Sequence, residues 1–177
     1  MSLEVADDFV LADSIPITGF TLWGGYNNGP TVADSFLIRL FADSVGQPGA
    51  LLWESAPEST SRTLTGATVL SGIYPEYLYT VTLPMPFPAQ AGVRYWLGIV
   101  NPMPEAETWQ WELTSPTGSP SPGIQRFDGT AWQPHAVLGT SFTVVPEPSS
   151  FALSLCSLAA WWLFIRPKHT IKFKGYA

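Results

Sequence analysis

Alternation of apolar and polar residues along short runs is the feature of this sequence that most restricts its fold. In residues 34–43, Phe36, Ile38 and Leu40 fall on one face of an extended chain, and their intervening neighbours fall on the other. Before residue 151, no stretch keeps a period of 3.6 residues over two helical turns. The sequence therefore predicts strands rather than helices for this part of the chain.

Runs of this kind recur at close spacing between segments rich in glycine and proline. Residues 23–30 and 84–88 are expected to be loops, because glycine favours turns and proline cannot donate to a strand ladder. A tight turn is expected at residues 46–49. The expected strands cover residues 9–11, 15–22, 34–43, 51–54, 76–83, 94–100, 109–113, 124–127, 131–132 and 141–145.

About nine short strands with such turns are typical of an all-β fold, an antiparallel β-sandwich that we expect to be jelly-roll-like. The alternation also predicts which side chains fill its interior. They are Phe36, Ile38, Leu40, Val81, Leu97 and Ile99.

The part of the chain before residue 145 is long enough for one domain with a substantial core and too short for two ordinary domains. Cys156 is the only cysteine, so no disulfide can form within the chain and packing has to provide its stability. All 14 acidic residues lie at or before Glu147, where four arginines oppose them, which leaves a net charge of −10. This charge argues against nucleic acid as a partner, and against anionic lipid or acidic polysaccharide held by charge alone.

Residues 145–177 have a different character, because residues 151–165 are apolar and uncharged. With the two serines that precede this run, a helix over residues 149–165 would be about 25 Å long, against a hydrocarbon core of about 30 Å. Local thinning of the bilayer and the long side chains of Arg166 and Lys168 can make up the difference. We expect one C-terminal transmembrane helix, followed by a basic tail on the cytoplasmic side.

A proline-rich triplet, Pro146, Glu147 and Pro148, precedes this helix. The triplet, the single apolar helix and the basic residues after it together resemble the PEP-CTERM sorting signal of exosortase substrates. The order of aromatic, glycine and aspartate residues from residue 5 to residue 144 also resembles ectodomains found on many PEP-CTERM proteins. We therefore divide the chain into a β-sandwich ectodomain, residues 1–144, and a PEP-CTERM-like sorting signal, residues 145–177.

The resemblance implies how the protein is processed and where it acts. It implies export, recognition by a membrane-embedded exosortase, cleavage near the triplet, and release or attachment at the surface of bacteria that make exopolysaccharide. The expected location is the inner membrane during sorting, and then the cell surface or the medium. The expected partners are the exosortase, the membrane and extracellular polysaccharide.

The start of the sequence lacks the basic and apolar regions of a secretory signal peptide. Because a C-terminal sorting signal serves an exported protein, we expect the natural chain to begin upstream of Met1. Two alternatives stay open. The product can be an unexported remnant, or the C-terminal helix can be an ordinary membrane anchor that follows an accidental Pro-Glu-Pro triplet.

The sequence carries none of the common catalytic or nucleotide-binding motifs. His135 is the only histidine before the C-terminal segment, and a triad with Asp128 and Ser141 can be written from their proximity in sequence. A loop histidine beside a proline is usually only solvated. We therefore expect a protein that is not an enzyme and has no cofactor.

Asp7, Asp8 and Asp43 lie near the ends of expected strands. Their carboxylates are candidate ligands for Ca²⁺, which prefers oxygen ligands. No calcium-loop spacing accompanies them. The alternative is that they are solvated charges that protect strand edges.

Aromatic residues provide the candidate ligand-binding surface. Trp23 and Tyr26 lie in one expected loop, and Trp109 and Trp111 lie on one face of an expected strand. Exposed indole and phenol rings bind the apolar face of a sugar, so either pair can form a carbohydrate-binding platform. The alternative is that these rings fill the core. Their exposure therefore distinguishes a carbohydrate-binding surface module from a structural sandwich.

Overall fold

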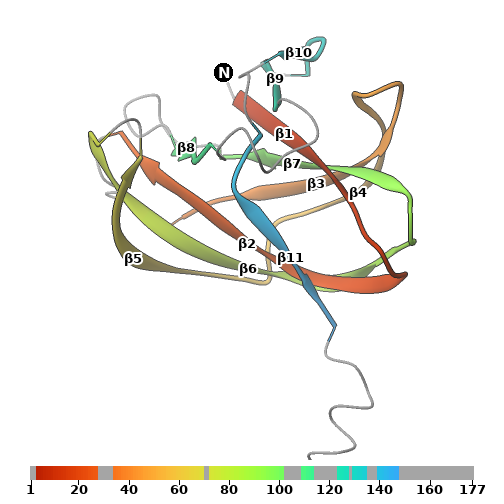
Figure 1. Cartoon of the computed structure of the whole chain (residues 1–177), viewed down its shortest axis with the longest axis horizontal. Helices are drawn as coiled ribbons and strands as arrows, with labels where there is room; N and C mark the ends of the chain where they lie inside the picture. Colours follow the sequence, from red (N-terminus) through yellow and green to blue (C-terminus); the bar gives the residue numbers. More distant parts are fainter. Residues whose placement is uncertain are drawn as a thin grey trace, which may run out of the picture. The chain divides into compact units, whose positions relative to one another are not determined.

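The computed structural model describes residues 3–27, 34–69, 72–101, 109–113, 123–127, 129–134 and 139–147, which fall within a compact unit that spans Met1–Glu147. Across these residues the chain is all-β, with eleven strands in two antiparallel sheets (Figure 1). The predicted all-β class is confirmed.

The larger sheet has six strands in the order β10-β9-β1-β7-β3-β4. The central strand β7 pairs with β1 on one side and with β3 on the other, so that Ile99 lies beside both Val5 and Ile38. The bounds of the strands are β1 Leu3–Val10, β3 Leu37–Asp43, β4 Pro48–Ser55, β7 Arg94–Val100, β9 Ile124–Phe127 and β10 Gln133–Pro134.

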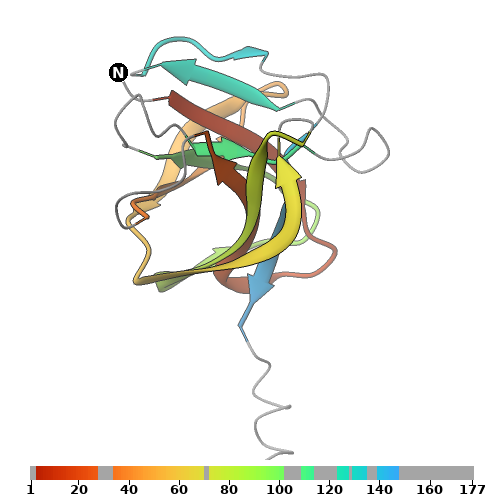
Figure 2. The ribbon, with the colours of Figure 1, turned by 90° about the vertical axis from the view of Figure 1, so that its left-hand side faces the viewer.

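The smaller sheet has the order β11-β2-β6-β5, and the short strand β8 also pairs with β2. Strands β5 and β6 lie side by side and curve together (Figure 2). The bounds are β2 Ile15–Tyr26, β5 Ser59–Val69, β6 Tyr74–Ala89, β8 Trp109–Trp111 and β11 Phe142–Pro146.

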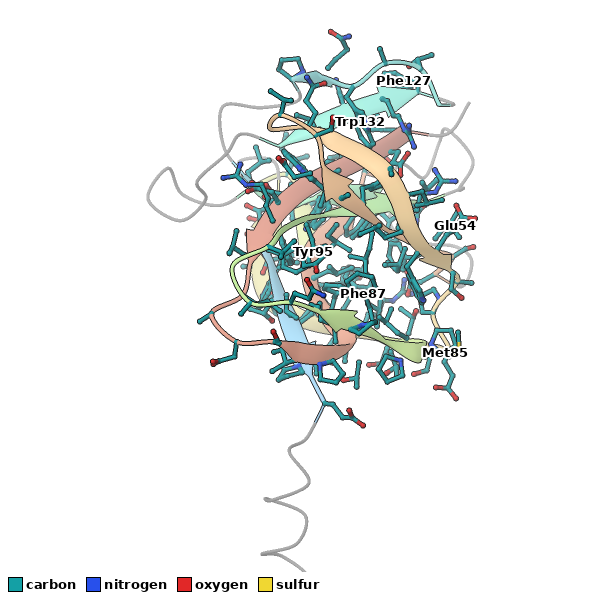
Figure 3. All side chains as sticks on the ribbon, turned by 90° about the vertical axis from the view of Figure 1, so that its right-hand side faces the viewer. Glu54, Met85, Phe87, Tyr95, Phe127 and Trp132 are labelled. Atoms are coloured by element: carbon teal, nitrogen blue, oxygen red, sulfur yellow. The ribbon has the colours of Figure 1, made fainter. Side chains whose placement is uncertain are left out.

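The core lies between the sheets and receives every second side chain from the strands on each side. Phe87 of β6 and Tyr95 of β7, for example, meet edge to face with their ring centroids 5.4 Å apart (Figure 3). The prediction of the interior side chains is confirmed, because all six are at most 4% exposed: Phe36, Ile38, Leu40, Val81, Leu97 and Ile99.

The prediction of a loop that starts at Trp23 is wrong, because β2 continues to Tyr26. The glycines here serve close packing rather than a turn. A Cβ atom on Gly24 would lie 2.6 Å from the ring of Trp109, so the absence of a side chain is what lets β8 pack against β2.

The prediction that residues 84–88 leave the sheet is also wrong, because β6 continues through them. The carbonyl of Thr82 accepts a hydrogen bond of 2.8 Å from the N–H of Glu58, on the side of β5. In an extended strand, the backbone groups of every second residue point to the same edge. Pro84, Pro86 and Pro88 are spaced by two from Thr82, so the N–H groups that they lack would have pointed to this same edge. There β5 begins only at Ser59, opposite Thr82, and its ladder ends before the prolines start.

Strand β5 was not predicted, because its sequence is dominated by serine and threonine and most of its side chains are exposed. No helix in the described ranges is long and apolar enough to cross a membrane. The expected helix over residues 149–165 lies outside those ranges.

Candidate functional site

The Pro-Glu-Pro triplet begins within the smaller sheet. Strand β11 extends through Pro146, and the backbone N–H of Glu147 donates to the carbonyl of Pro16 at 2.9 Å. The Thr18 hydroxyl donates to the carbonyl oxygens of Val145 and Pro146, at 3.2 and 3.3 Å. The side chains of Pro146 and Glu147 are nevertheless exposed. The sheet therefore continues past the expected boundary at residue 144 and holds the first part of the triplet in an extended conformation.

The remaining residues of the expected sorting signal, Pro148, Arg166 and Lys168, lie outside the described residues. So do Asp128 and His135, and the triad written from the sequence therefore stays a hypothesis without geometry.

Three of the four aromatic residues proposed for ligand binding lie in the core. Tyr26, Trp109 and Trp111 are 1%, 7% and 6% exposed. The Trp109 ring packs against Phe36 and Tyr79 in edge-to-face geometry, with centroid distances of 5.2 and 5.9 Å. These three rings form no exposed platform, and their contribution is to packing.

A polar network surrounds the hydroxyl of Tyr26. The hydroxyl donates to Asp34 at 2.8 Å and accepts from the side-chain amide of Asn101 at 3.1 Å, while Arg62 contacts the same Asp34 oxygen at 3.0 Å. Burial raises the pKa of Tyr26, and the Asp34 carboxylate raises it further. Tyr26 therefore stays protonated and donates to the Asp34 carboxylate, so that its buried hydroxyl has hydrogen-bond partners.

Trp23 differs from the other three rings, because its side chain lies on the outer face of the smaller sheet and is half-buried. Its backbone binds two neighbouring segments. The Trp23 N–H donates to the carbonyl of Ser141 at 3.2 Å, and the Trp23 carbonyl accepts from the N–H of Glu112 at 2.8 Å. Trp23 borders a shallow surface cavity of about 310 Å³, whose lining is Trp23, Glu76, Glu112, Ser141 and Phe142.

Two carboxylates line this cavity, Glu76 on β6 and Glu112 directly after the end of β8. The Thr65 hydroxyl donates to Glu76 at 2.7 Å and fixes its orientation. Burial raises the pKa of Glu112, and the negative charge of Glu76 raises it further. The cavity therefore offers an aromatic surface beside two strong hydrogen-bond acceptors.

The three aspartates proposed as calcium ligands do not converge. Asp7 is 1% exposed, and its carboxylate accepts from the backbone N–H and the hydroxyl of Thr140 at 2.6 and 3.1 Å. Burial raises its pKa. Asp8 is the next residue along β1, so it faces the opposite side of the sheet, where it lies 3.4 Å from Arg94.

Asp43 accepts a hydrogen bond of 2.9 Å from the indole N–H of Trp96, and its role there is to satisfy a buried donor. Nowhere in the described part of the chain do three histidine, cysteine, aspartate or glutamate side chains come close enough together to hold a metal ion.

Sequence reasoning missed an ion network on the outer face of the larger sheet. Glu4 is 3% exposed, and its Oε2 accepts from Arg126 Nε at 2.6 Å and from Arg39 Nη1 at 3.0 Å. Arg39 also donates to Glu54 at 2.6 Å, and the Arg126 guanidinium lies 4.3 Å from the ring centroid of Trp132. Alternation places Glu4 and Arg39 on the face of the sheet that points away from the core. This is the one feature of the sequence that could have indicated the network.

This network borders an open groove of about 670 Å³. Its charges are already paired at short distances, and a Cβ atom on Gly98 would lie 2.9 Å from Glu4 Oε1, which shows how tightly that oxygen is enclosed. Trp132 and Phe127 mark the β9–β10 side of this region, and Glu54 marks the β4 side (Figure 3). The contacts are those of an ion cluster that fastens β9 to the rest of the sheet.

Comparisons with known proteins bear on the family of the chain. No curated protein and no solved structure matches it. The model of a protein family described as a domain of unknown function, DUF7901, matches residues 1–148. This match covers most of the sequence and the whole of the described sandwich, and the chain therefore belongs to the DUF7901 family.

Proposed function

We propose that this protein is an exported bacterial protein of the cell surface or extracellular matrix, sorted by an exosortase and associated with exopolysaccharide, and that it is not an enzyme. The observation that carries the proposal is the position of Pro146 and Glu147, which are exposed at the end of an extended strand. Proline withholds a backbone donor and disfavours helix at the preceding residue, so a protease meets an extended chain here.

We infer two finer structural features as part of this proposal. The first is a jelly-roll-like connection of the sandwich, which the strand orders β1-β7-β3 and β2-β6-β5 support. The second is a transmembrane helix over residues 149–165 with Arg166 and Lys168 on its cytoplasmic side, which the apolar composition supports.

The sorting proposal is tested by expressing the chain behind an N-terminal export signal in a host that contains an exosortase. Mass spectrometry of the exported protein is expected to show a product that lacks everything from about the helix onward. The variants Glu147→Ala and Pro146→Ala should accumulate uncut protein, because Glu147 is the single charge that a basic group of the enzyme can bind there.

Glu58→Ala is the matched control, because Glu58 is also an exposed glutamate but lies outside the triplet. It should be cut like the parent protein. An intact C-terminus that reaches Ala177 in such a host would reduce the segment to an ordinary membrane anchor.

The second candidate function is that of a carbohydrate-binding surface module. The burial of Tyr26, Trp109 and Trp111 supports a structural sandwich instead. The half-buried Trp23 beside Glu76 and Glu112 is the specific observation in favour of a ligand.

A further inference from the structure

The outer face of the smaller sheet carries a row of hydroxyl side chains next to Trp23. The row crosses four strands in register. These strands, β5, β6, β2 and β11, are neighbours in the smaller sheet (Figure 1). Neighbouring strands are about 4.8 Å apart, a spacing comparable to the length of one sugar unit in an extended glycan. The members of the row are Ser61, Thr80, Thr21 and Thr143.

Trp23 and the hydroxyl row belong to one surface. Trp23 and Thr21 are two residues apart on β2, so their side chains leave the same face of the sheet about 7 Å from each other. On the other side of the ring, Glu76 and Glu112 line the cavity described above. The aromatic surface therefore lies between a pair of acceptors and a line of groups that can both donate and accept.

Strand propensity alone does not account for this face. Threonine is common on the exposed side of strands, and this preference explains the hydroxyl row. It does not explain why the partly buried Trp23 lies beside this cavity, or why Glu112 and Glu76 line one cavity although their like charges repel. A bound molecule that donates hydrogen bonds to both carboxylates would relieve this repulsion.

We propose that this face binds a neutral polysaccharide, with Trp23 under one sugar ring, Glu76 and Glu112 accepting from its hydroxyls, and the row of Ser and Thr hydroxyls contacting the adjoining units. An indole surface matches the apolar C–H face of a sugar, and carboxylates match its hydroxyl donors. The negative charge of the domain disfavours acidic glycans. This inference rests on the extracellular role proposed above.

The test is affinity electrophoresis of the purified full chain in native gels that contain hydroxyethylcellulose, galactomannan or dextran, with alginate as the acidic comparison. We expect retardation in at least one of the neutral gels and none in alginate. Trp23→Ala should weaken the association about tenfold, because the stacking surface is lost. Glu112→Gln should weaken it as well, because an amide is the poorer acceptor.

Matched controls come from the larger sheet. Phe127→Ala removes an exposed aromatic ring, and Glu54→Gln neutralises an exposed glutamate, and neither should change the retardation. Trp23→Phe keeps a smaller stacking surface and should keep most of the binding. If circular dichroism shows that Trp23→Ala does not fold, Glu112→Gln provides the test.

The proposal is overturned if none of the three neutral gels retards the protein, if alginate retards it more strongly, or if Trp23→Ala and Glu112→Gln bind like the parent. It is also overturned if Phe127→Ala weakens binding as much as Trp23→Ala does. Because the purified protein is measured without a host, these outcomes are independent of whether an exosortase cuts the chain.

Discussion

Replacing Glu4 with glutamine removes one charge from the ion network of the larger sheet and keeps the shape of the side chain. Removing one partner of a buried ion pair costs roughly 3–5 kcal/mol, because the other charge is left without compensation. Here Arg39 keeps Glu54, and Arg126 keeps the ring of Trp132. The two arginines are also 25% and 19% exposed, so water screens them. We therefore expect Glu4→Gln to lower the free energy of unfolding by about 2 kcal/mol.

Urea denaturation at neutral pH, followed by tryptophan fluorescence and by circular dichroism, measures this loss. Glu54→Gln is the control, because it removes a charge from the same network at a position that is 39% exposed. A surface pair contributes at most about 1 kcal/mol, so the control should lose less than half as much as Glu4→Gln.

An equal loss in the two variants would refute the reasoning, because burial of Glu4 would then contribute nothing beyond a surface ion pair. A gain in stability for Glu4→Gln would show that the desolvation of the carboxylate outweighs its two hydrogen bonds.

Three further predictions concern the core. Trp109→Ala should destabilise the protein by roughly 3–5 kcal/mol in the same urea assay, because it leaves a cavity among buried aromatic rings; a loss below 1 kcal/mol would contradict its core position. Gly24→Ala should cost roughly 1–3 kcal/mol and less than that in a Trp109→Ala background, since part of the clash is with that ring; strict additivity in the double variant would argue against the contact. Burial raises the pKa of Asp7, so its contribution to stability is present below the ordinary aspartate value and is lost as pH rises through the raised one. Over that range the urea midpoint should fall less with pH in Asp7→Asn than in the parent, and parallel curves would refute this.

Alternation was a sufficient guide where one face of a strand meets the core. Val81, for example, is buried between Thr80 and Thr82, which are more exposed, so a period of two identifies it directly. It failed for β5, because a strand exposed along most of its length gives hydrophobic alternation little to report. A different rule failed at residues 84–88, where the prolines predicted a loop. Proline removes a backbone donor, but the sequence does not show whether the edge that lacks the donor needs one.

The candidate site could not be predicted from the sequence, because it depends on which strands pair. The sequence alone does not show which of Trp23 and Trp109 is buried, and the pairing of β8 with β2 is what places the Trp109 ring in the core while Trp23 stays partly exposed. Likewise, Glu76 and Glu112 are far apart in sequence, and they line one cavity only because β6 and β8 both pair with β2 near Trp23. The calcium prediction failed for the opposite reason. Asp7 and Asp8 are neighbours in sequence, but their side chains face opposite sides of the sheet.

The pairing of β11 with β2 has a consequence for the order in which the protein folds. Thr18 meets Val145 across 127 residues of sequence, so one edge of the smaller sheet is completed by nearly the last residues of the domain. Such long-range contacts form late and slow the folding of β-proteins. During synthesis, the edge of β2 that β11 covers therefore stays unpaired until β11 has been made. Because β11 includes Pro146, the first residue of the Pro-Glu-Pro triplet, the sheet can close only after the chain has been made as far as this triplet.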